Sequence, residues 1–165
     1  MGMLATVINS IALKEVIRRN NGKALVYSLI DMPKVAFTYN LDHVNHKLDN
    51  GYICIFAGGT GSPYFSTDTG AALHAAEIGA KYILVGKDGV DGIYSADPKT
   101  NKNAKRFDKL TYDQIINMDL KVMDMTAITF SKTNDINLIV FNNNQKDGII
   151  KAINRKTKIT TVLNK

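Results

Sequence analysis

Hydrophobic and polar residues recur with a helical period over several stretches of the chain. Near the amino terminus they form one apolar stripe at three- and four-residue spacing, which predicts a helix. The stripe consists of Leu4, Val7, Ile8, Ile11, Ala12 and Val16. Asn20-Asn21-Gly22 then supplies a helix stop signal. Spacing and capping residues predict further helices at about 41–48, 68–78, 111–118, 124–133 and 148–154.

Short apolar runs between these helices predict strands. The runs are residues 24–30, 52–56, 81–85, 138–141 and 159–163. Residues 52–56 (YICIF) and 81–85 (KYILV) are uninterrupted and rich in β-favouring residues, as is typical of buried parallel strands. Because strands and helices alternate, we expect an α/β protein, a three-layer αβα sandwich with a largely parallel sheet. Neither a repeat nor a linker interrupts the sequence, so residues 1–165 are predicted to form one domain.

Composition narrows the class of protein without identifying it. The chain has 165 residues, of which 45% are hydrophobic and 22% charged, as in ordinary soluble globular proteins. It contains no apolar run near the roughly 20 residues that cross a bilayer and no signal peptide pattern. Cys54 is the single cysteine, so an intrachain disulfide framework is excluded and a cytoplasmic protein is expected.

The net charge of +6 does not by itself indicate a nucleic-acid binder. Such proteins usually gather lysine and arginine on one element, whereas here the basic residues are dispersed. An anionic small substrate explains the charge at least as well. We therefore expect no nucleic-acid partner.

The segment 57–68 (AGGTGSPYFSTD) is the first stretch that suggests chemistry. It follows a predicted strand and precedes a helix, where ligands bind in open α/β sheets. Its glycines allow several N–H groups to approach one anion, and the helix amino terminus adds partial positive charge. A solvated glycine-rich turn is an equal alternative from the residues alone. No lysine follows the glycines as in a Walker A loop, so a cation for phosphate must come from elsewhere.

The segment 86–98 (GKDGVDGIYSADP) is the second such stretch. Tyr94 and Asp97 lie three residues apart, so an aromatic face and a carboxylate can point at one ligand. Asp97 precedes Pro98 and is biased towards an extended conformation. A β-turn with aspartates at turn positions remains the alternative.

The two segments, taken in order with three other blocks, resemble the uridylate kinases of the amino-acid-kinase family. The blocks are GMLATVIN, AGGTGSPYFSTDTGAAL, KDGVDGIYSADP, LTYDQIINMDLKVMDMTA and LIVFN. The resemblance covers essentially the whole chain. It implies an αβα sandwich that transfers the γ-phosphoryl group of ATP to UMP, with Mg²⁺, giving UDP and ADP in pyrimidine nucleotide biosynthesis. It also implies a homohexamer, while GTP and UTP as effectors stay open.

Carried over by motif, the resemblance implies specific site residues. The UMP-binding residues would be Thr60, Gly61, Ser62, Pro63, Tyr64, Phe65, Ser66 and Thr67. Tyr94 and Asp97 would contact ATP. Asp88 stands where the family often has asparagine or threonine, and we expect it to contact adenosine or water. Asp124 would be an acidic residue at the reaction centre that orients a lysine, and Asp68 would lie near the phosphates. An N-cap is the structural alternative for Asp124.

The same resemblance implies elements that this sequence does not match. The family begins with a strand carrying a Lys-x-Ser-Gly-Glu type element, a glycine-rich loop and an arginine. We therefore expect the sequence to represent the carboxyl-terminal two-thirds of the enzyme, with missing sheet strands and little or no kinase activity. The alternatives are a non-catalytic nucleotide-binding fragment and a related kinase of carbamate or an amino acid, although the hydroxyl-rich segment 62–67 favours a nucleotide.

Three further groups are expected to be structural. Asp42, His43 and His46 lack a further ligand cluster and are predicted to lie on a solvated helix face, so no protein metal site is expected. His74 lies mid-helix and is predicted to be a packing or surface residue. Cys54 is predicted to be a small buried hydrophobic residue.

Overall fold

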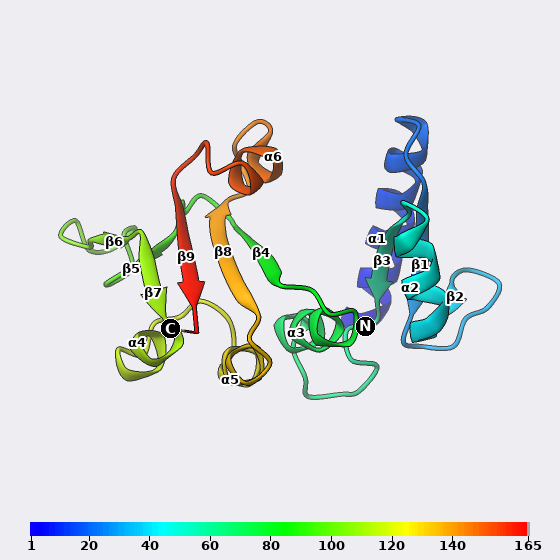
Figure 1. Ribbon diagram of the computed structural model, residues 1–165, viewed down its shortest axis with the longest axis horizontal. Helices are drawn as coiled ribbons and strands as arrows, with labels where there is room; N and C mark the ends of the chain where they lie inside the picture. The colour runs from blue at the N-terminus through cyan, green and yellow to red at the C-terminus, as the bar shows by residue number, and fades with distance from the viewer. Residues whose placement is uncertain (165) are drawn as a thin grey trace. The chain divides into compact units, whose positions relative to one another are not determined.

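The computed structural model describes residues 1–164 and divides the chain into two compact units, Met1–Ile78 and the residues from Gly79 onward (Figure 1). No linker in the sequence marks this division, and the single partial domain stays a prediction. Each unit combines helices with a mostly parallel sheet, which confirms the α/β class. Within residues 1–164, the helices are too short or too polar to span a bilayer.

The first unit contains a three-stranded, fully parallel sheet in the order β2-β1-β3. Its elements are α1 (Gly2–Arg19), β1 (Ala24–Ser28), β2 (Phe37–Thr38), α2 (Leu41–Asp49), β3 (Ile53–Ala57) and α3 (Thr67–Glu77). Helix α1 ends where the stop signal predicts, with Asn20 as its C-cap and Asn21 at a φ of 62°.

Alternating side chains of the sheet contact helices on both of its faces. On one face Val26 and Ile55 pack with Val7 of α1. On the other face, the ring of Tyr27 contacts His43 of α2, and the ring of Phe56 stacks on His74 of α3. The first unit is therefore a layered helix–sheet–helix arrangement, as predicted.

The predicted apolar stripe of α1 is only partly buried. Val7 and Ile11 pack into the core, whereas Leu4, Ile8 and Val16 are 48%, 69% and 56% exposed. The sheet covers a narrow face of the helix that also includes the buried Ser10, whose hydroxyl is satisfied by the Thr6 carbonyl at 2.7 Å. Spacing predicted the helix correctly but not the width of its buried face.

The second unit is built on a four-stranded sheet in the order β4-β8-β9-β7. Its elements are β4 (Tyr82–Lys87), β5 (Ile93–Tyr94), β6 (Arg106–Phe107), β7 (Lys109–Thr111), α4 (Tyr112–Asn117), α5 (Met125–Thr133), β8 (Asn137–Asn142), α6 (Gly148–Ile153) and β9 (Ile159–Leu163). The β4–β8 and β7–β9 pairs are parallel, while β8–β9 and the small β5–β6 pair are antiparallel. The sheets are thus largely parallel.

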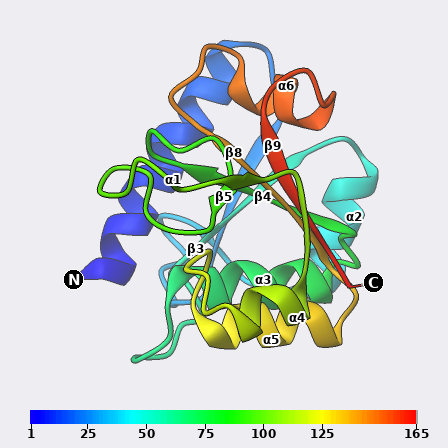
Figure 2. The same ribbon diagram turned by 90° about the vertical axis from the view of Figure 1, so that its left-hand side faces the viewer.

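Both faces of the central strand β8 are buried. Leu138 and Val140 pack with Ile115 of α4 and Ile128 of α5, and the next residues, Ile139 and Phe141, pack with Ala152 of α6. Helices α4 and α5 contact each other and lie side by side in both views (Figure 1, Figure 2). This unit is also a helix–sheet–helix sandwich.

Strands β3 and β4 are less buried than their sequences predict. Ile53 is 50% exposed and Tyr82 is 44% exposed, and Cys54 is half-buried. Each of these strands lies at the edge of its sheet, where one side lacks a neighbouring strand. Apolar composition identified the strands but did not distinguish an edge from a centre.

Candidate functional site

The acceptor loop, defined as residues 57–68, follows β3 and leads into α3. Gly58, Gly59 and Gly61 have φ values of 89°, 63° and 73°, which favour glycine. A Cβ on Gly61 would lie 3.0 Å from the Leu29 carbonyl oxygen. The loop therefore depends on glycine both for its backbone angles and for its close approach to Leu29.

Hydroxyl groups hold this loop from within and from α1. The Gly58 N–H donates to the Thr6 hydroxyl at 2.8 Å, and the Ser62 N–H donates to the Thr60 hydroxyl at 3.2 Å. The Ser66 hydroxyl accepts the Thr69 N–H at 3.1 Å and is the N-cap of α3. Helix α3 therefore begins at Thr67, one residue earlier than the predicted start at residue 68.

A hollow of about 330 Å³ lies between the acceptor loop and the start of α1. The predicted residues Ser62, Pro63, Tyr64, Phe65 and Thr67 line it, together with Met1, Gly2, Met3, Thr6, Gly58 and Gly59. The amino terminus of the eleven-residue helix α3 follows the loop directly. The hollow therefore combines hydroxyl groups and a helix dipole, which suits an anion.

Two aromatic side chains of the acceptor loop project into solvent. Tyr64 is fully exposed with a φ of 71°, and Phe65 is 56% exposed. Both rings are more exposed than aromatic side chains usually are in folded proteins, so both are available to a ligand such as a nucleobase. Thr60, Gly61 and Ser66 shape the loop without lining the hollow. UMP binding by residues 60–67 stays a prediction.

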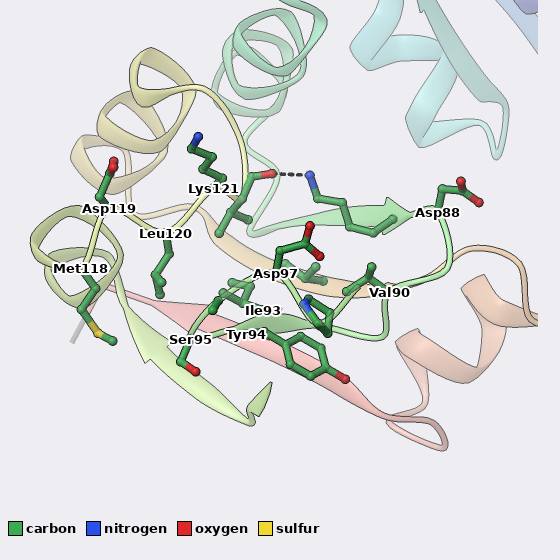
Figure 3. A pocket seen from close by; sticks show the side chains of 16 residues that line it. Asp88, Val90, Ile93, Tyr94, Ser95, Asp97, Met118, Asp119, Leu120 and Lys121 are labelled. Atoms are coloured by element: carbon green, nitrogen blue, oxygen red, sulfur yellow. Dashed lines mark hydrogen bonds between the residues drawn. The ribbon is translucent and has the colours of Figure 1, made fainter. Parts of the chain in front are cut away.

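The ATP-side pocket, of about 540 Å³, lies in the second unit. The structure brings together the three predicted residues Asp88, Tyr94 and Asp97 in its lining. Figure 3 shows that the labelled side chains come from two segments, the stretch from Asp88 to Asp97 and the stretch Met118–Lys121. The second segment was not predicted from the sequence, where it carries no turn or charge pattern of its own.

Hydrogen bonds fix the orientation of the three predicted residues. The Tyr94 hydroxyl donates to Asp91 at 2.6 Å, and this bond raises the pKa of Tyr94. The Asp97 carboxylate accepts the Lys99 N–H at 2.8 Å, and the Asp88 carboxylate accepts from the Asn144 amide at 2.7 Å. The turn-type contact of Asp97 confirms the structural alternative, which does not exclude a ligand contact because a carboxylate accepts several hydrogen bonds.

Lys87 places a cation at the pocket. It is the last residue of β4, and its ammonium donates a hydrogen bond to the Val122 carbonyl, drawn as the dashed line in Figure 3. Lys121 also lines the pocket. An ammonium at the carboxyl end of a parallel strand is well placed for a phosphate. Sequence reasoning did not assign this role, although the strand-end position was a usable signal.

The two predicted catalytic aspartates belong to different units. Asp124 is the N-cap of α5, since its carboxylate accepts the Ala127 N–H at 3.0 Å. This confirms the structural alternative. Val122, two residues earlier, lines the ATP-side pocket, whereas Asp124 is outside that lining. Asp68 lies in the first turn of α3, where a carboxylate stabilises the helix dipole. Catalysis by either residue stays a prediction.

The residues expected to be structural have identifiable packing roles. His74 is buried at 5% exposure, which confirms that it is a packing residue. His43 contacts the Tyr27 hydroxyl at 3.3 Å instead of facing only solvent. Burial raises the pKa of the Cys54 thiol. Among residues 1–164, no three His, Cys, Asp or Glu side chains gather as a metal-ligand cluster.

Comparison with known proteins adds independent evidence. Residues 1–142 match the model of the amino acid kinase family. The chain is 51% identical to a uridylate kinase of Mycoplasmopsis pulmonis, with 99% of this chain and 68% of that protein covered. It is 48% identical to a uridylate kinase of Malacoplasma penetrans, with 98% of this chain and 51% of that protein covered.

Solved structures agree with the sequence relatives. The crystal structure of UMP kinase from Ureaplasma parvum matches with a TM-score of 0.95 at 38% identity, over 98% of this chain and 68% of that one. UMP kinase from Bacillus anthracis matches with a TM-score of 0.93 at 36% identity, over 99% and 67%. The chain thus spans between about half and two-thirds of the length of these relatives.

Proposed function

The chain belongs to the amino acid kinase family, among its uridylate kinases, and on this premise we propose that it transfers the γ-phosphoryl group of ATP to UMP as part of a UMP kinase. The observation that carries the proposal is the presence of two separate hollows of suitable chemistry within one chain. The acceptor loop offers N–H groups and hydroxyls to a monophosphate, and the ATP-side pocket offers carboxylates, an aromatic ring and cations.

On the acceptor side, the α3 amino terminus and the hydroxyl groups of Ser62 and Thr67 receive the UMP phosphate. The exposed rings of Tyr64 and Phe65 contact the nucleoside, and Ser66 and Thr67 complete the acceptor loop at the helix start. The closely packed glycines keep the loop in one conformation, so binding costs little ordering entropy.

On the ATP side, Tyr94 and Asp97 contact the nucleotide, and Asp88 contacts adenosine or a water molecule. A carboxylate repels the ATP phosphates, and Asp88 is already held by the Asn144 amide. Lys87 and Lys121 are the cations of this pocket lining and neutralise phosphate charge, which is the main electrostatic requirement of phosphoryl transfer.

Mg²⁺ enters this scheme with ATP. The carboxylates of Asp88, Asp97 and Asp119 line the pocket, but they do not form a ligand cluster within the described residues. Such a donor set fits Mg²⁺, which usually keeps several waters and binds through nucleotide phosphates and one or two carboxylates. The ion would supply further neutralisation of phosphate charge, while Asp68 and Asp124 each orient a charged group.

The polypeptide of this sequence, on its own, is expected to have little or no kinase activity. It spans about two-thirds of the Mycoplasmopsis pulmonis relative, and the Lys-x-Ser-Gly-Glu element has no match in it. The second candidate function is accordingly nucleotide binding without transfer. The same two hollows favour this second function, because residues of this chain alone form them.

Calorimetric titration with UMP and with ATP, combined with a coupled assay of ADP release, tests both functions. Binding of both nucleotides with turnover supports the kinase, and binding without turnover supports the second function. Binding of neither nucleotide contradicts both. Turnover close to that of a full-length relative would contradict the expected low activity of this polypeptide. The variant Ser62→Ala tests whether UMP binds at the predicted residues. The variant Ser10→Ala, outside the acceptor loop, is its matched control.

A homo-oligomer and a cytoplasmic location complete the proposal. Helix α1 exposes Leu4, Ile8 and Val16, which is a cost in water unless another surface covers them. Light scattering of the wild type and of Ile8→Asp measures the molecular mass in solution and therefore the oligomeric state. An oligomer that dissociates in the variant supports the proposal, and a monomeric wild type contradicts it. GTP or UTP control is tested by adding either nucleotide to the kinase assay.

A further inference from the structure

His74 on α3 reaches back to the acceptor loop through a buried hydrogen bond. Its Nε2 atom lies 3.3 Å from the Gly59 carbonyl oxygen, and its Nδ1 atom lies 2.9 Å from Glu77 Oε2. The ring is 5% exposed and stacks on Phe56 with 4.7 Å between ring centroids. A buried imidazole held on three sides has a fixed orientation, so it can transmit that orientation to the loop.

Helix α3 meets the acceptor loop at Gly59 in a second way. A Cβ on Gly70 would lie 3.1 Å from the Gly59 carbonyl carbon, so the two backbones pack closely at this point. Gly70 and His74 are four residues apart and therefore lie on the same face of the helix. Both contacts fix Gly59, whose φ of 63° sets the course of the acceptor loop.

Both ring nitrogens of His74 have a hydrogen-bond partner in this cluster. One faces the Gly59 carbonyl oxygen and the other faces the Glu77 carboxyl group. Glu77 Oε2 also accepts the Tyr39 hydroxyl at 2.5 Å. Burial and this hydrogen bond raise the pKa of Tyr39, which keeps the hydroxyl a donor. The imidazole is therefore held at both ring nitrogens, and Glu77 links it to Tyr39.

We infer that His74, Glu77 and Tyr39 form a positioning cluster that holds the Gly59 carbonyl, and with it the acceptor loop, in the conformation that receives a nucleoside monophosphate. The inference rests on the proposed function for its ligand. Within the described residues, Glu77 and Tyr39 are the titratable groups that contact the imidazole. Removal of the imidazole removes the contact with the Gly59 carbonyl oxygen, so it loosens the acceptor loop.

The test begins without ligand, so that it does not depend on UMP. We expect His74→Phe to keep the stack on Phe56 but to speed hydrogen exchange of residues 58–62 by about tenfold, since the hydrogen bond to the Gly59 carbonyl oxygen is lost. His46→Phe, on the exposed face of α2, is the matched control and should leave the exchange unchanged.

UMP titration then separates this inference from the proposed function. We expect His74→Phe to weaken UMP binding about tenfold without changing ATP binding. Unchanged exchange and unchanged UMP affinity in the variant would overturn the inference. Faster exchange in a protein that does not bind UMP supports the cluster but contradicts the proposed function.

Glu77→Gln provides a second variant if His74→Phe does not fold. The amide keeps an oxygen that accepts the Tyr39 hydroxyl but removes the negative charge beside His74. We expect this variant to hold the imidazole less firmly, with faster hydrogen exchange of residues 58–62 than in the wild type. Unchanged exchange in a folded Glu77→Gln protein would show that Glu77 does not position His74 and would overturn the cluster.

Discussion

Each unit places a candidate binding segment directly after a β-strand, but the two units hold these segments in different ways. In the second unit, nine buried residues form one continuous cluster beneath the ATP-side pocket. In the first unit, the corresponding cluster beneath the acceptor loop has four buried residues. The acceptor loop is instead held by glycines, hydroxyls and the His74 cluster. A binding site can therefore be positioned by a large apolar core or by dense local hydrogen bonding.

Truncation of the larger core should have the greatest effect on stability. The side chain of Leu138 on β8 is fully buried and packs with residues of α4 and α5. We therefore expect Leu138→Ala to lower the free energy of unfolding by about 3 kcal/mol. Leu4→Ala on the half-exposed side of α1 should cost less than about 1 kcal/mol. Urea denaturation measures both. Equal losses would contradict the contrast between the two units.

Alkaline pH offers a second way to compare the units, because each buries a tyrosine. Burial raises the pKa of Tyr112 to about 12, and its hydroxyl donates to the Ile136 carbonyl at 2.6 Å. Burial likewise raises the pKa of Tyr27 to about 12. The unfolded side chains ionise near pH 10, so stability present below pH 10 is lost as pH rises through 12.

For Tyr112 this loss should reach roughly 2 kcal/mol at pH 12. Tyr112→Phe should be less stable than the wild type near pH 7 by about 1 kcal/mol, through the lost hydrogen bond, but should lose less stability between pH 10 and 12. Tyr64→Phe, at a fully exposed position, should behave like the wild type throughout. Parallel pH profiles for the wild type and Tyr112→Phe would contradict this linkage.

The acceptor loop should be sensitive to single atoms. We expect Gly61→Ala to weaken UMP binding at least tenfold, because the residue has a φ of 73° and its Cβ would meet the Leu29 carbonyl oxygen at 3.0 Å. Gly79→Ala has a similar φ of 67° but no atom within 4 Å of the added Cβ. Gly79→Ala therefore adds backbone strain without a steric contact, and it should leave UMP affinity unchanged. Calorimetric titration of both variants decides.

The sequence predicted the local elements well, since each depends on short-range signals. The stop signal at Asn20–Gly22, the cap at Asp124 and the apolar run of β8 all lie where expected. It failed where the outcome depends on distant partners. The exposure of Ile53 and Tyr82 follows from strand order, and the buried face of α1 follows from the width of the sheet it covers.

The candidate sites show the same division. Tyr94 and Asp97 were found because they lie three residues apart in one loop, and they line one pocket. The segment 118–122 lines the same pocket from a distant part of the chain and was missed. His74 was predicted to be a packing or surface residue and is buried, but its contact with Gly59 spans fifteen residues and has no signature in the local sequence.

Asp124 gives the smallest expected effect on stability and the sharpest separation of two roles. Serine is as good an N-cap as aspartate, so Asp124→Ser should keep the hydrogen bond to the Ala127 N–H and change the free energy of unfolding by less than about 0.5 kcal/mol. Asp124→Ala should cost about 1 kcal/mol. If Asp124 also orients a charged group during transfer, a full-length enzyme with serine here loses most of its turnover while remaining stable. Turnover equal to wild type in that variant would restrict Asp124 to capping α5, and the second unit would then contribute nucleotide binding without a catalytic carboxylate at this position.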